Sequence, residues 1–216
     1  HPQRGMQGVA DIPAQLSIEV TKDVGQSEPS RPGGGQLDRQ WQPVETPAQV
    51  GDERGFFYES WIKARFAGAG LHLDFVQGNV SASARGVLRG LHYQWPNPQG
   101  KLVSVLEGEV YDVAVDIRRG SPSFGRWTAV MLTAENKRHF WIPEGFAHGF
   151  AVVSERAVFC YQCTAAYDAA ADAGLRWNDA ALGIDWPLAE PTLSPKDAKA
   201  PFLADIPTER LPLYTP

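Results

Sequence analysis

An arginine and a histidine, three residues apart in a β-prone run, are the side chains of this chain best suited to chemistry. The run reads Gly86-Val87-Leu88-Arg89-Gly90-Leu91-His92-Tyr93-Gln94. An imidazole titrates near neutrality and can therefore accept and return a proton, and a guanidinium fits phosphate oxygens. Side chains alternate along a strand, which predicts Arg89 on one face and His92 on the other. Taken alone, the strand favours a His92 that is satisfied within a core.

Short apolar runs separated by turn residues must position these side chains. The chain contains 21 Gly and 17 Pro, which punctuate it heavily. Glu107-Gly108 indicates a compact hairpin between two of the runs. The spacing predicts an antiparallel sandwich or barrel with a few short helices. Strands are expected at 71–79, 101–106, 109–117, 127–132 and 157–164, with a further candidate strand at 41–50. Helices are expected at 61–69 and from Ser194-Pro195.

Length and charge limit the function classes. The 216 residues suit one domain, expected at 37–216, preceded by a Pro- and Gly-rich extension at 1–36. The formal charge of −5 argues against polymeric nucleic acid as a partner. No apolar run has membrane-spanning length, and no secretory pattern opens the chain. A cytoplasmic protein is therefore expected.

The two cysteines, Cys160 and Cys163, have a C-x-x-C spacing that is found in redox and zinc motifs. No second Cys/His pair completes a metal site, and no strand-to-helix context supports a redox motif. Their odd spacing places them on opposite faces of a strand. We interpret them as ordinary strand residues.

Pro143-x-Gly145-x-x-His148 resembles the second half of the cupin signature, a turn that delivers a histidine into a jelly-roll barrel. In metal-dependent cupins the first half supplies two more histidines and a glutamate. Here the matching place reads His92-Tyr93-Gln94, with one histidine and no acidic ligand. A catalytic metal is therefore disfavoured, and no cofactor is expected.

A set of segments, in order, resembles the dTDP-4-dehydrorhamnose 3,5-epimerase family. Together they cover most of residues 45–205, and the resemblance implies a cupin-type jelly roll. The segments are Gly51-Asp52-Glu53-Arg54-Gly55-Phe56-Phe57, Val87 to Gln94, Val110 to Arg118, Ser121-Pro122-Ser123-Phe124-Gly125, Pro143 to Phe150 and Trp177-Asn178-Asp179.

The resemblance implies epimerisation at the two carbons that flank the ketone of a dTDP-4-keto-6-deoxy sugar. Removing either proton gives an enolate, so a base, an acid and an oxyanion stabiliser are needed. His92 matches the family's base, Tyr161 its acid and Lys101 the lysine near the keto oxygen. Asp179 matches the carboxylate that pairs with the histidine. Without the resemblance, Asp179 would be a helix cap, Tyr161 a core aromatic residue and Lys101 a solvated charge.

Seven further residues match substrate-binding positions of the family: Arg54, Arg89 and His148 near the nucleotide-sugar, Glu59, Gln77 and Asn79 near the nucleotide, and Tyr167 at the pocket. Two of them have structural alternatives of nearly equal weight. Glu59 could belong to a surface pair, and His148 could be hydrogen-bonded inside the barrel.

Family members are homodimers that exchange strands near the N-terminal part, so Arg54 and Glu59 are expected to serve the partner's site. Three other functions stay open. They are an epimerase acting at one centre only, a catalytically silent cupin that binds a sugar nucleotide, and a metal-dependent cupin oxygenase.

Overall fold

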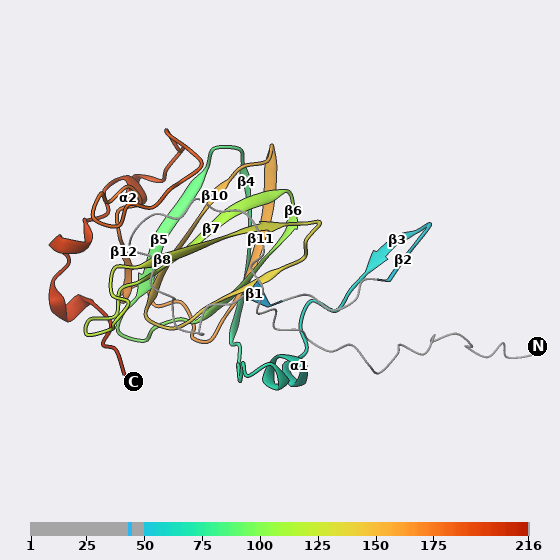
Figure 1. Ribbon diagram of the computed structural model, residues 1–216, viewed down its shortest axis with the longest axis horizontal. Helices are drawn as coiled ribbons and strands as arrows, with labels where there is room; N and C mark the ends of the chain where they lie inside the picture. The colour runs from blue at the N-terminus through green and yellow to red at the C-terminus, as the bar shows by residue number, and fades with distance from the viewer. Residues whose placement is uncertain (1–42, 45–49, 216) are drawn as a thin grey trace, which may run out of the picture.

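A computed structural model describes residues 43–44 and 50–215 of the protein (Figure 1). The predicted extension at 1–36 lies outside the described residues, as does most of the possible strand at 41–50. The described chain is built mainly from strands, with one short helix before β4 and the other helical segments at its C-terminal end. The prediction of a mainly β protein is therefore confirmed.

Two five-stranded antiparallel sheets face each other as a jelly-roll barrel (Figure 1). The first sheet has the order β1(Pro43–Val44)-β9(His139–Ile142)-β6(Lys101–Glu107)-β11(Arg156–Cys163)-β4(Gln77–Ala84). The second has the order β12(Asp172–Gly174)-β5(Leu88–Gln94)-β10(Phe146–Val152)-β7(Glu109–Asp116)-β8(Trp127–Thr133).

The turn at Gly108 was expected to close a hairpin, and this prediction was wrong. β6 pairs with β9 and β11, whereas β7 pairs with β10 and β8. Gly108 has φ +75° and turns the chain from one sheet into the other. A Cβ atom there would lie 1.9 Å from the carbonyl oxygen of Arg156, so only glycine fits this corner.

The strand expected at 71–79 begins later, because β4 starts only at Gln77. Residues 71–75 are irregular, and Leu71, Leu73 and Phe75 pack with α1 (Lys63–Gly68) rather than in a ladder. Leu73 and Phe66 are buried there with Trp141. The alternating apolar residues over 71–75 thus reflect burial beside a helix. Sequence alternation alone does not distinguish this arrangement from a strand.

The barrel interior is apolar in its middle, with Phe140, Phe150 and Phe159 among the buried residues. A second cluster covers the outer face of the second sheet, where Leu91 and Tyr93 of β5 meet Leu175, Ile206 and Leu211 of the C-terminal segment. That segment contains α2 (Pro195–Ala198), η1 (Leu203–Asp205) and η2 (Thr208–Arg210), which lie beside β5 and β12 in Figure 1.

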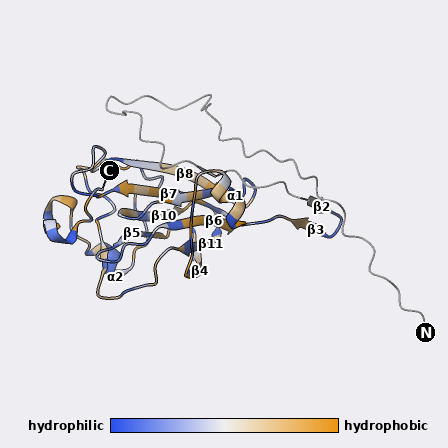
Figure 2. Cartoon of the chain, turned by 90° about the horizontal axis from the view of Figure 1, so that it is seen from below, coloured by the Kyte–Doolittle hydropathy of each residue, from blue (hydrophilic) through white to orange (hydrophobic). Residues whose placement is uncertain are grey.

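A small hairpin of β2 (Val50–Asp52) and β3 (Gly55–Phe57) stands away from the barrel in both views. Figure 2 shows that β3 is apolar. Phe56 and Phe57 are 59% and 66% exposed, so the hairpin has no apolar cover within the described chain.

Candidate active site

A bulge in β5 places Arg89 and His92 on one cavity. The register of β5 against β10 runs His92↔His148 and then Arg89↔Phe150, so β5 has one residue more than its partner. Gly90 has φ +121°, and the strict alternation of faces breaks there. The prediction that Arg89 and His92 lie on opposite faces was therefore wrong. Both line an open cavity of about 260 Å³.

Glycine is required at this bulge because the two strands approach closely. A Cβ atom on Gly90 would lie 2.5 Å from Cα of Gly149, and one on Gly149 would lie 2.7 Å from the carbonyl oxygen of Arg89. The sequence showed the gap left by Gly90 but not what fills it. The backbone of β10 fills it.

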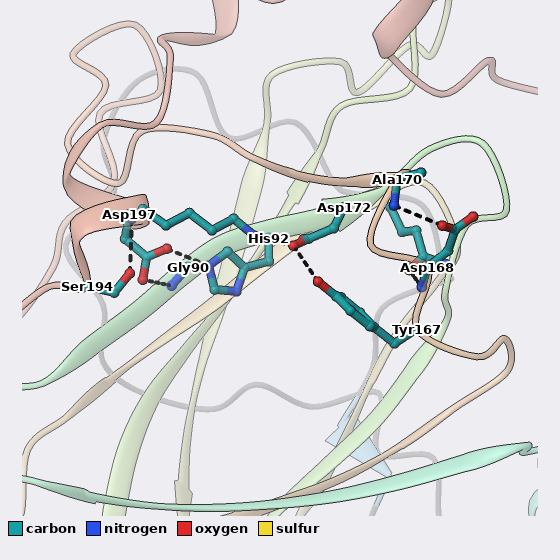
Figure 3. A network of polar contacts seen from close by, with 10 residues as sticks. Gly90, His92, Tyr167, Asp168, Ala170, Asp172, Ser194 and Asp197 are labelled. Carbon is teal, nitrogen blue, oxygen red and sulfur yellow. Dashed lines mark hydrogen bonds and ion pairs between the residues drawn. The ribbon is translucent and has the colours of Figure 1, made fainter.

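His92 forms a close hydrogen bond with a carboxylate at the mouth of this cavity (Figure 3). Its Nε2 lies 2.6 Å from Oδ1 of Asp197, which comes from α2. The imidazole is 35% exposed, whereas the carboxylate is 4% exposed. Because Nε2 donates its hydrogen bond to the carboxylate, Nδ1 of the same ring is free to interact with another group.

The helix start and the bulge together hold Asp197. The Asp197 N–H donates to Oγ of its N-cap Ser194 at 3.1 Å, and the Gly90 N–H donates to Asp197 Oδ2 at 3.4 Å. Burial acts to raise the pKa of Asp197, but the hydrogen bond and charge of His92, together with the hydrogen bonds of Gly90 and Ser194, outweigh it, and the pKa is lowered. The carboxylate is therefore ionised at neutral pH.

Asp179 does not pair with His92, and that prediction was wrong. Its Oδ1 accepts from the Ala181 N–H at 2.9 Å and its Oδ2 from the Leu203 N–H at 2.8 Å. Asp179 thus caps a turn and ties it to the C-terminal segment, in agreement with the capping alternative. Sequence reasoning identified the helix start at Ser194-Pro195 but missed its Asp197 as the partner of His92.

Tyr161, Lys101 and Asn79 lie on the first sheet, across the barrel from β5. In the register of β11, Tyr161 is opposite Asn79 of β4, and Cys163 is opposite Lys101 of β6. Burial raises the pKa of Tyr161, so its phenol keeps its proton at neutral pH. The Asn79 amide donates to Sγ of Cys163 at 3.7 Å, and Cys160 contacts Ser104 instead. The two thiols therefore face opposite ways, as expected, and both are free.

Lys101 is a buried cation between the two sheets. It is 9% exposed, and no described residue forms a hydrogen bond or ion pair with its ammonium group. Burial lowers its pKa, while the charges of Asp112 and Asp172 on the second sheet oppose that change. A cation without a direct ion pair at this place can stabilise an anion that forms beside it.

His148 is buried in a second histidine–carboxylate pair. Its Nε2 lies 3.0 Å from both carboxylate oxygens of Asp112, on the neighbouring strand β7. The ring stacks on Phe159 with centroids 6.0 Å apart. This is the arrangement of the structural alternative, a histidine hydrogen-bonded inside the barrel. Sequence reasoning did not single out Asp112. In the alternating pattern of β7 it occupies a position that is typical of a solvent-facing polar residue.

Tyr167 joins a polar network at the edge strand β12 (Figure 3). Its hydroxyl donates to Asp172 at 3.0 Å, and Lys196 pairs with the same carboxylate. Its N–H donates to Oε1 of Gln77 at 2.7 Å, and the amide of Gln77 donates to Asn79 at 3.0 Å. Three predicted residues, Tyr167, Gln77 and Asn79, are thus linked. Asp172 and Lys196 were not predicted.

Arg54 and Glu59 are not joined to this network. Arg54 pairs with Asp52 on the β2–β3 hairpin, and Glu59 pairs with Arg65 of α1 at 2.9 Å. Neither side chain contacts His92 within one chain. That they contribute to the active site of a partner subunit stays a prediction.

No cluster of three or more histidine, cysteine or acidic side chains suited to a metal ion occurs in the part of the chain that the structure describes. No helix among the described residues could span a membrane.

Comparisons with known proteins agree with this geometry. The sequence model of the dTDP-4-dehydrorhamnose 3,5-epimerase family matches residues 43–205. The chain belongs to this family. An enzyme named dTDP-4-dehydrorhamnose 3,5-epimerase from Pseudomonas aeruginosa is 55% identical over 161 residues, 74% of this chain and 89% of that protein.

Two solved structures show the same fold. RmlC from Legionella pneumophila, described as a 3,5-epimerase in complex with dTDP-4-keto-L-rhamnose, is 52% identical with a TM-score of 0.80, covering 84% of this chain and 97% of the other. ChmJ, a 3'-monoepimerase from Streptomyces bikiniensis in complex with dTDP-quinovose, is 36% identical with a TM-score of 0.74, covering 81% and 90%. The protein is an enzyme of the isomerase class with the cupin-type jelly roll of its family.

Proposed function

We propose that the protein inverts both C3 and C5 of dTDP-4-keto-6-deoxy-D-glucose to give dTDP-4-keto-L-rhamnose, in dTDP-L-rhamnose biosynthesis. The observation that carries the proposal is the His92–Asp197 pair, with 2.6 Å between Nε2 and Oδ1, at the open cavity that Arg89 also lines. Membership of the epimerase family supports the same substrate and reaction.

His92 acts as the base through Nδ1. Because Nε2 donates to Asp197, Nδ1 carries the lone pair that can accept a proton from C3 or C5. The imidazolium formed by this step is stabilised by the ionised Asp197 carboxylate.

Lys101 stabilises the enolate. When the proton leaves, negative charge develops on the C4 oxygen, and the ammonium group of Lys101 has no competing ion pair among the described residues. Burial strengthens this interaction because little water screens it.

Tyr161 returns a proton from the opposite face of the sugar. It lies on the first sheet while His92 lies on the second, so the two groups can flank a ring held between the sheets. Arg89 is assigned to the diphosphate, and Gln77, Asn79 and Tyr167 are assigned to the nucleotide.

We further propose a homodimer in which the β2–β3 hairpin reaches the partner and presents Arg54. Phe56 and Phe57 of the hairpin and Val80 and Leu106 of the first sheet are 59%, 66%, 68% and 49% exposed. Unpaired apolar side chains of this kind favour an interface. Light scattering that finds a monomer at micromolar concentration would refute the dimer. The expected absence of a metal and cofactor and the cytoplasmic location stay predictions.

The first experiment is proton NMR in deuterated water with dTDP-4-keto-6-deoxyglucose, followed by a 4-keto reductase trap. Deuterium at C3 and C5 and an L-rhamnose product are expected. Label at one carbon only would support a single-centre epimerase such as ChmJ. No label would support a silent binder.

Tyr161→Phe is the matched variant for the same experiment. We expect exchange of the acidic hydrogens to persist while inversion falls sharply, because His92 is intact and only the return proton is lost. Equal loss of exchange and inversion would refute the assignment of Tyr161 as the acid.

A further inference from the structure

A second cavity, of about 340 Å³, lies on the other side of the edge strand from His92. In the register of β12 against β5, Tyr93 is opposite Ala173, whereas His92 is opposite Gly174. Tyr93 packs on the outer face of the second sheet with Ile206, which also lines the cavity, so the cavity lies on that face and extends around the edge of β12. The C-terminal segment forms its other wall, and the cavity is open to solvent.

Most of the wall is apolar. It is formed by Ala173, Ala200, Pro201, Ile206 and Pro207. Asp197 and Lys196 line both this cavity and the cavity that contains His92. Their charges are already paired, Asp197 with His92 and Lys196 with Asp172.

Three other polar groups at this cavity have no partner. Tyr93 is 5% exposed, and its hydroxyl makes no hydrogen bond to any residue that the structure describes. The ion pairs of the described chain include neither Lys199 nor Arg210, which line the same cavity. Burial raises the pKa of Tyr93 and the nearby Arg210 opposes this, so the hydroxyl and the guanidinium lie near each other.

We propose that this cavity binds a small organic anion, of the carboxylate class with a flat apolar body. A guanidinium donates two parallel hydrogen bonds to a carboxylate, and a phenol hydroxyl can donate a third. The apolar wall takes the body of the ligand, and the cavity has the size of sites that hold small molecules. Two unpaired cations and no unpaired carboxylate give the site a preference for anions.

The test uses 4-fluorobenzoate as the probe and fluorine NMR titration of the full chain. Saturable binding is expected, with 4-fluorobenzyl alcohol binding at least tenfold more weakly because it lacks the charge. Arg210→Gln should weaken binding at least tenfold and Tyr93→Phe about threefold. Arg85→Gln, which removes an exposed cation elsewhere, should leave the affinity unchanged.

Competition separates this site from the substrate cavity. Saturating dTDP should not displace the probe, and Arg89→Gln should bind it as the parent protein does. Displacement by dTDP, or loss of binding in Arg89→Gln alone, would overturn the proposal, as would equal binding of the alcohol or no saturable binding. Because Tyr93→Phe keeps the aromatic ring, its unchanged circular dichroism and melting temperature exclude misfolding as the cause of a weaker affinity.

Discussion

Two histidine–carboxylate pairs lie next to each other in this barrel, and they differ in access to solvent. His92 and His148 are opposite residues of β5 and β10. The side chain of His92 is 35% exposed and its partner comes from the C-terminal helix α2, whereas that of His148 is 7% exposed and its partner Asp112 comes from the adjacent strand. The same two residue types thus form one pair that a substrate can reach and one that the core encloses.

Burial changes what the enclosed pair can do. It lowers the pKa of His148 and raises the pKa of Asp112, and in each case the partner's charge only partly opposes it. Breaking such a pair leaves a polar group without a partner in the core, which is costly. The exposed pair should therefore govern turnover and the enclosed pair stability.

The largest expected effect is the loss of the base. His92→Ala should lower turnover by about 10⁴-fold, because general base catalysis contributes on this scale. The partly exposed side chain leaves little packing to lose, so the melting temperature should stay within a few degrees. Nucleotide binding, followed by calorimetry with dTDP, is the control. Retained turnover would refute the assignment of His92.

The enclosed pair gives the largest stability effect. Asp112→Ala should lower the free energy of unfolding by about 1–3 kcal/mol, because it leaves the buried His148 ring without its hydrogen-bond partner. Urea unfolding measures this change. A stability within 0.5 kcal/mol of the parent, combined with lost turnover, would instead give the enclosed pair a catalytic function.

The two candidate carboxylates can be compared directly. Asp197→Asn should lower turnover on the order of 10³-fold, since the amide cannot stabilise the imidazolium. Asp179→Asn should leave turnover within about threefold and cost about 1 kcal/mol of stability, as expected for a cap. The reverse ranking would restore Asp179 as the partner that the sequence suggested.

A third histidine, His139, shows the effect of burial without a carboxylate. Burial lowers its pKa from 6.5 to about 4. Below pH 6.5 this histidine binds a proton in the unfolded chain, whereas in the folded chain it stays neutral until about pH 4. The free energy of unfolding therefore falls as the pH drops from 6.5 to about 4. The loss should reach about 3 kcal/mol at about 1.4 kcal/mol per pKa unit. Unfolding of His139→Phe between pH 7 and 4 should show a shallower pH dependence; an unchanged slope would contradict this expectation.

The sequence predicted the positions of the strands better than it predicted which strands pair with each other. Short apolar runs bounded by turn residues identified β6, β7, β8 and β11 nearly to their ends, because both signals are local. The turn at Gly108 was also predictable. The sequence did not show that the chain passes from one sheet to the other at this turn. That outcome depends on which strands β6 and β7 meet, and no local pattern records it.

The site was predictable to the same extent. His92, Lys101 and Tyr161 were assigned through the family resemblance, and their strands place them around the barrel interior. Asp197 was missed because an aspartate in the first turn of a helix has an ordinary local explanation. Arg89 was assigned to the wrong face because a bulge adds one residue without leaving a sequence pattern of its own.

The position of Asp197 in the chain also sets when the His92–Asp197 pair can form during synthesis. Asp197 follows His92 by 105 residues and comes after the last strand, β12, which ends at Gly174. A ribosome-bound chain can therefore complete every barrel strand while its base still lacks the carboxylate. A protease that cuts between Gly174 and Ser194 would leave Asp197 held to an intact barrel only by non-covalent contacts. The carboxylate partner of His92 is thus the last part of this pair to be synthesised.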